Sequence, residues 1–212
     1  MNIIIAASGP SYKDLDKNLL YQNEDIVIIA VNGAYEYLNY KADIFFTLDP
    51  SPANLKRLSV RSETLMYCAT DKKCRVLLPD HVMPLTRIST QPKEILPKGT
   101  SKYWFHRWGC VKGLAEKASE IHTGNSAYGA LGLAYHLRPE KILLLGVDGT
   151  AQPRLTGEGP SKYSLVHLPY LFSTAVKQLE SAGIEVVNGS PTSAIDCFPR
   201  TTPERGIEWI QQ

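Results

Sequence analysis

The sequence predicts an α/β fold: a Rossmann-like, mostly parallel sheet with helices on both faces and a lid-like excursion. Three observations indicate it. Continuous apolar runs of strand length recur along the chain, helical patterns lie between several of them, and small or polar residues follow directly after them. Runs rich in Ile and Val are typical of strands that are buried on both faces. Strands that alternate with helices indicate a parallel sheet.

The apolar runs set the expected strands. The three strongest end in Ser-Gly, Asn-Gly or Asp-Gly, which are turn sequences. We expect strands over residues 3–7, 26–31 and 141–147, and weaker ones over 43–48, 64–67, 75–78 and 185–187.

Three segments have helical patterns. Residues 126–137 are rich in Ala and Leu, and Pro139 follows them. Residues 168–182 place apolar side chains on one face, and Gly183 after them is a natural C-cap. Residues 112–121 are the third candidate. Each of these segments is therefore predicted as a helix.

The length of 212 residues fits one ordinary domain. We expect a single domain over residues 1–200 and a C-terminal tail over 201–212. The Pro-rich segment 79–108 is predicted as a lid or loop excursion. It ends in an aromatic cluster at 103–108, which could stack on a base or sugar or could plug the space under the loop.

Composition excludes several classes of protein. With 43% hydrophobic and 21% charged residues, the chain is neither disordered nor a coiled coil. A net charge of +2 gives no strong signal for nucleic-acid binding. The four cysteines contain no C-x-x-C pair, so we expect reduced thiols in the packing. There is no signal-peptide pattern and no transmembrane segment, so the expected location is cytoplasmic.

Small and polar residues after the strands are the candidate binding residues. In an open parallel sheet, ligands bind beyond the carboxyl ends of the strands. A helix start that carries hydroxyls and free amides also suits a phosphate or a sugar hydroxyl. Ordinary turns and helix caps would explain the same residues equally well. The candidates are Ser8, Gly9, Pro10, Ser11, Asn32, Gly33, Asp49, Asp148, Thr123, Gly124, Asn125 and Ser126.

Two acidic residues and one histidine are candidates for chemistry. Asp49 and Asp148 follow strands and could hold Mg²⁺ that carries a nucleotide phosphate, or each could fix a turn. His167 precedes the helix predicted over 168–182 and could act as a general base, or as a cap. The sequence has no G-x-G-x-x-G, Walker or G-x-S-x-G motif, which argues against dehydrogenases, P-loop proteins and serine hydrolases.

The order of these motifs resembles the bacterial family-42 sialyltransferases and, more distantly, the 6-hydroxymethylpterin diphosphokinase-like family. The resemblance covers residues 2–50 and 120–199. One departure concerns the tyrosines that follow the Gly-Ile-Asp strand end in the sialyltransferases, because Gly149-Thr150 stand there and only Tyr163 is nearby. The matching motifs are Ser8-Gly9-Pro10-Ser11, Asn32-Gly33, Asp49-Pro50, Thr123-Gly124-Asn125-Ser126, Gly146-Val147-Asp148, His167, Leu179-Glu180 and Asn188-Gly189-Ser190-Pro191.

The resemblance implies inverting transfer of a sugar from a CMP-activated donor, with no cofactor. It implies that His167 deprotonates the acceptor hydroxyl and that Tyr163 stabilises the donor phosphate. The acceptor would be a glycan or another hydroxyl compound, and an oligomer is compatible with the sequence. The diphosphokinase-like alternative implies ATP, with Mg²⁺ at Asp49 and Asp148. A nucleotide-binding protein without catalysis is the third hypothesis.

Overall fold

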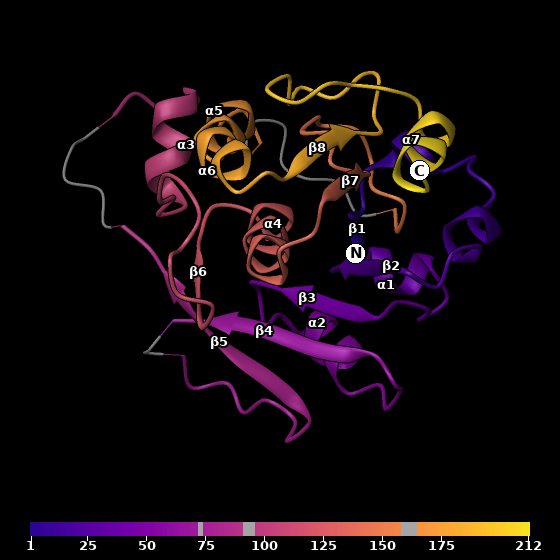
Figure 1. Ribbon diagram of the computed structural model, residues 1–212. Helices are drawn as coiled ribbons and strands as arrows, with labels where there is room; N and C mark the ends of the chain where they lie inside the picture. The colour runs from indigo at the N-terminus through magenta and orange to yellow at the C-terminus, as the bar shows by residue number, and fades with distance from the viewer. Residues whose placement is uncertain (72–73, 91–95, 158–164) are drawn as a thin grey trace.

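The computed structural model describes residues 1–71, 74–90, 96–157 and 165–212. They build one eight-stranded sheet in the order β6-β5-β4-β3-β2-β1-β7-β8, with every neighbouring pair parallel (Figure 1). The predicted Rossmann-like α/β fold is confirmed. The strands are β1 (Asn2–Ala6), β2 (Ile26–Val31), β3 (Ile44–Thr47), β4 (Leu65–Thr70), β5 (Val82–Ile88), β6 (Glu120–His122), β7 (Lys141–Leu145) and β8 (Glu185–Asn188).

Helices cover both faces of the sheet, so the molecule has three layers (Figure 1). One face carries the 3-10 helices η1 (Pro10–Tyr12) and η2 (Lys17–Tyr21), with α1 (Ala34–Tyr37), α2 (Pro52–Leu58) and α7 (Pro203–Ile210). The other carries α3 (Ser101–Arg107), α4 (Ser126–Leu137), α5 (Leu168–Ser173) and α6 (Val176–Ser181).

Strand β1 shows why the apolar runs are continuous. Its residues alternate between the faces: Ile3 and Ile5 pack under α4, while Ile4 and Ala6 pack on the opposite side. All four side chains are at most 1% exposed. Burial of such a side chain stabilises the folded state by about 1.5–3 kcal/mol. Both faces of the central strands therefore contribute to the hydrophobic core.

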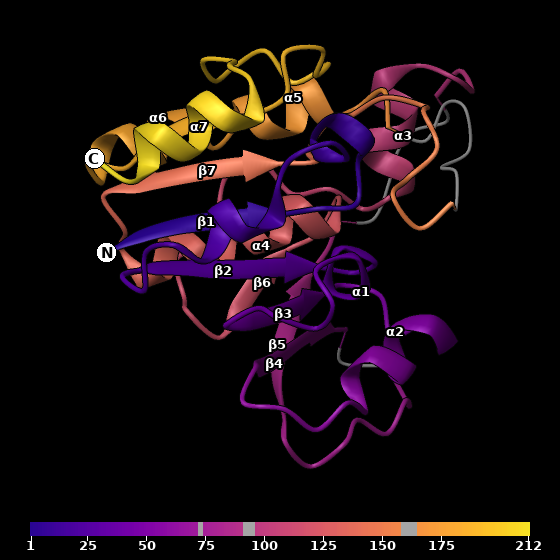
Figure 2. The same ribbon diagram turned by 90° about the vertical axis from the view of Figure 1, so that its right-hand side faces the viewer.

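The winding of the sheet reverses at β1. From β1 the chain adds β2, β3, β4, β5 and β6 outward on one side, and then α4 returns it so that β7 pairs with the other side of β1. Figure 2 shows β7 and β2 pointing to the same edge of the sheet. In an open parallel sheet, the connections diverge at such a switch point and leave a crevice beyond the carboxyl ends of the strands.

Several predicted elements differ from the structure. Within the expected excursion over 79–108, residues Val82–Ile88 form β5, which pairs with β4. Residues 75–78 form no strand. The helix predicted over 112–121 is also wrong: these residues form turns and end in β6. There the backbone N–H groups of Gly113 and Leu114 donate to side chains of neighbouring segments instead, at 2.9 and 2.6 Å.

The predicted helix over 168–182 is interrupted, and α5 and α6 are separate. At the break, the hydroxyl of Thr174 donates to the carbonyl of Leu171 at 2.7 Å and accepts from the N–H of Gly113 at 2.9 Å. Local hydroxyl bonds of this kind compete with helical ones.

The C-terminal segment, expected as a tail, forms α7 and packs on the sheet. Ile207 and Ile210 are buried, and Gly206 lies directly over Leu143 of β7. The side-chain amide of Asn2 donates to the carbonyl of Ile210 at 2.8 Å. Residues 203–210 therefore belong to the domain.

The cysteines behave as packing thiols where the structure describes them. Cys68 and Cys110 are buried, and burial raises the pKa of each thiol to about 12. None of the four cysteines takes part in a disulfide. Among the helices of the described ranges, none is long and apolar enough to cross a membrane.

Candidate functional site

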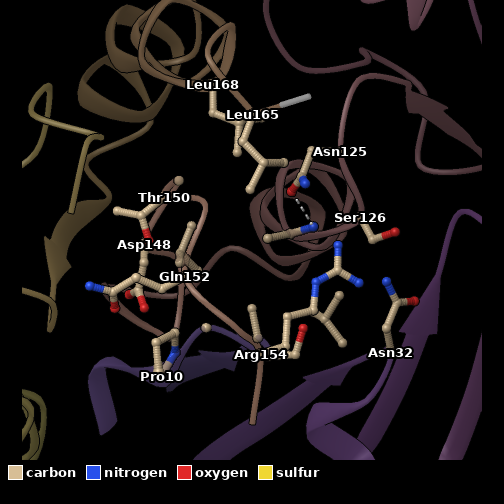
Figure 3. Close-up of a pocket in the computed structure, with 18 residues that line it drawn as sticks. Pro10, Asn32, Asn125, Ser126, Asp148, Thr150, Gln152, Arg154, Leu165 and Leu168 are labelled. Carbon is tan, nitrogen blue, oxygen red and sulfur yellow. Dashed lines mark hydrogen bonds between the residues drawn. The ribbon is translucent and has the colours of Figure 1, made fainter. Parts of the chain in front are cut away.

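A cavity lies at the switch point, between the carboxyl ends of β1, β2 and β7 and the start of α4 (Figure 3). Its volume is about 70 Å³. Of the predicted site residues, the lining includes Ser8, Gly9, Pro10, Asn32, Asn125, Ser126 and Asp148. The structure adds polar and apolar side chains that the sequence did not indicate, namely Thr150, Gln152, Arg154, Leu165 and Leu168.

The remaining predicted residues that the structure describes do not line this cavity. Tyr163 lies outside the described residues. The others are Ser11, Gly33, Asp49, Thr123, Gly124 and His167. Thr123 is buried, and its backbone N–H donates to the carbonyl of Ile88 at 2.9 Å.

The two carboxylate oxygens of Asp148 have different surroundings. The side chain is buried, and Oδ2 accepts from the backbone N–H of Ser11 at 3.0 Å. A Cβ on Gly9 would lie 2.5 Å from the same Oδ2, so only glycine fits beside it. Oδ1 is buried and accepts no hydrogen bond from any described residue. Asp148 therefore fixes a turn and also keeps one free acceptor beside the cavity.

The turn after β8 holds the backbone of Asp148. The N–H of Ala194 donates to the carbonyl of Asp148 at 2.8 Å, and the hydroxyl of Ser193 donates to the carbonyl of Val147 at 2.9 Å. Asn188 in turn donates to that hydroxyl at 3.0 Å. This turn supports the cavity wall without lining it.

The segment after β7 brings Arg154 into the site. The N–H of Leu155 donates to the carbonyl of Ser8 at 2.9 Å, and Thr156 covers Gly33 so closely that a Cβ there would lie 2.8 Å from it. These contacts place the Arg154 guanidinium beside Ser126 and Asn32 (Figure 3). Within the described ranges, no group accepts a hydrogen bond from it. The loop carries no motif that could have identified Arg154 from sequence.

The start of α4 forms the facing wall. Asn125 caps this 12-residue helix, because its Oδ1 accepts from the N–H groups of Ala127 at 2.8 Å and Tyr128 at 3.4 Å. The first turn contains no acidic residue, so the positive end of the helix dipole is not neutralised there. With Arg154, this wall attracts anions.

His167 and Gly124 join two helices beside the cavity. His167 is 1% exposed, and its Nε2 bonds the carbonyl of Gly124 at 3.1 Å. Because a carbonyl only accepts, Nε2 carries the hydrogen. A Cβ on Gly124 would lie 2.5 Å from Leu171, so this glycine permits close helix packing. The role of His167 as a base stays a prediction.

Asp49 and Asp148 do not meet in the cavity. Asp49 is exposed and outside the lining, and its backbone is bonded by Thr47 and Asn54. Among the described residues, no three His, Cys, Asp or Glu side chains come together as metal ligands. Mg²⁺ is often held by one or two carboxylates and substrate phosphates. Asp148 is the carboxylate that fits this requirement.

The aromatic cluster at 103–108 lies on α3 and directly after it, and it does not line the cavity. Phe105 is buried and packs on Tyr170, with ring centroids 5.4 Å apart. Trp104 stacks on Trp108, and Trp108 is 47% exposed. Phe105 therefore fills the space between α3 and α5, as the plug hypothesis expects.

Glu36 and Arg57 form an ion pair behind the site. Nη2 of Arg57 donates to Oε2 of Glu36 at 2.7 Å, and this bond lowers the pKa of Glu36 below its ordinary 4.5. Tyr40 and Lys56 lower it further. This pair could not be predicted from the sequence, because the two side chains lie on different helices.

The pair predicts a specific pH dependence of stability. A carboxyl whose pKa is lowered by folding stabilises the protein above pH 4.5, and that contribution is lost as the pH falls through the lowered pKa. At pH 7 we expect Glu36→Gln to cost about 1 kcal/mol, or about 2–4 °C in Tm. The difference should shrink below pH 4.5 in thermal melts across pH. An unchanged difference at low pH would show that the charge of Glu36 contributes nothing.

Comparison with known proteins finds no matching family model, no similar curated protein and no similar solved structure. A larger hollow of about 800 Å³ lies beside residues 59–65 and 79–81, before β4 and β5 begin. It lies at the amino ends of these strands, whereas ligands of an open parallel sheet usually bind beyond the carboxyl ends.

Proposed function

We propose that the protein binds a nucleotide at the switch-point cavity and transfers a sugar from a nucleotide-activated donor. One observation carries the proposal. The guanidinium of Arg154 and the side chain of Asn32 meet beside the start of α4, and Arg154 donates no hydrogen bond to any described residue (Figure 3). Converging donors at a helix start are complementary to phosphate.

The volume of the cavity indicates which part of the nucleotide it holds. Sites that bury small ligands usually measure roughly 300–1,000 Å³. The 70 Å³ here is enough for a phosphate group and too little for a nucleoside. In this proposal the phosphate lies inside, and the base and sugar extend from it.

The same geometry suits glycosyl transfer. The acceptor hydroxyl attacks the anomeric carbon, the bond from that carbon to the phosphate oxygen breaks, and the nucleotide leaves with the bonding electrons. Arg154 and the helix start stabilise the charge that develops on the phosphate. Asp148 accepts a hydrogen bond from a sugar or acceptor hydroxyl through Oδ1. His167 is the base that the family resemblance implies, and in this proposal it takes the proton of the acceptor hydroxyl.

A diphosphokinase-like reaction is the second candidate. Its support is the buried Oδ1 of Asp148, which has no partner among the described residues and belongs to a residue that lines the same cavity. Such an oxygen could bind Mg²⁺ that is carried by ATP. Asp49 would then contribute only after moving, because it is outside the lining.

A nucleotide panel tests the proposal. Thermal unfolding is measured with CMP, CDP, UDP, GDP, ADP and ATP, each with and without Mg²⁺. A ligand at about 100 times its Kd stabilises the native state by about 2.7 kcal/mol, which raises Tm by about 5–10 °C. A shift with CMP or another nucleotide that needs no Mg²⁺ supports glycosyl transfer. A shift only with ATP and Mg²⁺ supports the second candidate, and the absence of any shift contradicts both.

A further inference from the structure

We propose that Glu36, Arg57 and Asn54 form a positioning relay that fixes the amide of Asn32 with its NH₂ group toward the cavity. The part of the cavity that Asn32 lines would then bind only a group that accepts a hydrogen bond, such as a phosphate oxygen. The identity of the ligand rests on the proposed function, whereas the orientation of the amide does not.

The relay begins at Arg57, whose side chain can only donate. It is 6% exposed on α2. Nη2 donates to Glu36 Oε2 and Nη1 donates to Asn54 Oδ1, both at 2.7 Å. The atom of Asn54 that faces Arg57 must therefore be its oxygen, and the NH₂ group must face the other way.

Asn54 passes this orientation to Asn32. Asn54 is 3% exposed, and its Nδ2 donates to the carbonyl of Asp49 at 2.8 Å. A carbonyl only accepts, so this bond fixes the same orientation independently. Nδ2 also lies 3.0 Å from Thr47 Oγ1 and 3.2 Å from Asn32 Oδ1. The oxygen of Asn32 is thus directed toward Asn54.

The NH₂ group of Asn32 is consequently the end that remains for a ligand. Asn32 has φ +52°, a left-handed conformation that asparagine tolerates better than most residues. Figure 3 shows its nitrogen on the side of the Arg154 guanidinium. Two donors that face each other need an acceptor between them. Since the relay prevents Asn32 from turning its oxygen inward, a phosphate oxygen satisfies both donors.

The substitution Asn54→Asp tests the relay with almost no change in shape. The new carboxylate still accepts from Arg57, but it can donate neither to Asn32 nor to the carbonyl of Asp49. The amide of Asn32 then turns, donates to the carboxylate and presents its own oxygen to the cavity. We expect about 10- to 100-fold weaker binding of the nucleotide that gives the largest Tm shift in the panel, measured by calorimetry. Binding of the matching nucleoside, which lacks phosphate, should change less than twofold.

Two controls separate orientation from charge. Asn18→Asp adds the same charge at an exposed position of η2 and should leave binding unchanged. The double variant Asn54→Asp/Glu36→Gln restores the net charge around Arg57. If the loss comes from the turned amide, the double variant still binds weakly. Recovery to the wild-type affinity would mean that charge alone was responsible and would overturn the relay.

A spectroscopic measurement on the wild-type protein tests the relay even if the Asn54→Asp variant does not fold or no nucleotide binds. The side-chain ¹⁵N–H₂ signals of Asn32, assigned by their loss in Asn32→Asp, are followed during titration with inorganic pyrophosphate. We expect these signals to shift with saturation, and the side-chain signals of Asn18 to stay fixed. Asn32 signals that do not move would overturn the relay even if a nucleotide binds elsewhere. Movement without any nucleotide binding would retain the relay and reject the proposed function.

Discussion

The variant Arg154→Ala is expected to bind nucleotide about 10- to 100-fold more weakly, while its Tm without ligand stays within about 2 °C of wild type. The affinity falls because a guanidinium and a phosphate form charge-assisted hydrogen bonds. The stability is kept because no described residue accepts a hydrogen bond from Arg154. Substitutions that break no such contact usually change stability by about 0.5 kcal/mol or less. Calorimetric titration and thermal melts measure the two effects separately.

Two further substitutions control this experiment. Arg154→Lys keeps the charge but loses the planar pair of donors, so an intermediate affinity is expected. Arg61→Ala removes an exposed arginine that lies before β4, away from the cavity, and should bind as wild type does. Wild-type affinity in Arg154→Ala would contradict a phosphate site at this position.

The variant Gly146→Ala is expected to lose about 3 kcal/mol of stability or more. Gly146 follows β7 with φ +65°, and a Cβ there would lie 2.4 Å from the carbonyl oxygen of Ala7. That oxygen belongs to the backbone after β1 and cannot rotate away, so the two loops at the switch point must separate. Left-handed backbone adds a cost of roughly 1–2 kcal/mol for a residue with a side chain. The expected fall in Tm is roughly 10 °C.

Gly183→Ala is the matched control for this effect. Gly183 has φ +71°, and no atom lies within 4 Å of the position that its Cβ would take. It therefore carries the conformational cost without the collision, and we expect a loss of about 1 kcal/mol. Equal losses in the two variants, measured by denaturant unfolding, would show that β1 and β7 are not in close contact after their last residues.

The strands could be predicted from sequence because their signal is local. The run Ile26–Val31 is apolar at every position, since both faces of β2 are buried, and the predicted bounds match the strand. The helix Ser126–Leu137 could be predicted because its signals are local too. The residue that caps its start and the residues that end it are close to it in the chain. By contrast, β5 contains Pro84 and Arg87, and the segment around it is rich in proline, so its pairing with β4 was not evident.

Part of the candidate site could also be predicted. Residues such as Ser8, Asn32 and Asp148 follow strands, and a parallel sheet carries all strand ends to one edge. The prediction could not say which strand ends become neighbours. Asp49 and Asp148 both follow strands, yet only Asp148 follows a strand beside β1, where the winding reverses.

The sequence by itself determined the fold class, the central strands and the polar residues at their ends, because each depends on the periodicity and chemistry of consecutive residues. Only the tertiary structure decided that β7 pairs with β1, that a loop brings Arg154 against Asn32, and that Arg57 and Asn54 orient this amide. These relations join side chains from separate elements. Their geometry depends on how the sheet winds and how the helices pack, and no local pattern encodes it.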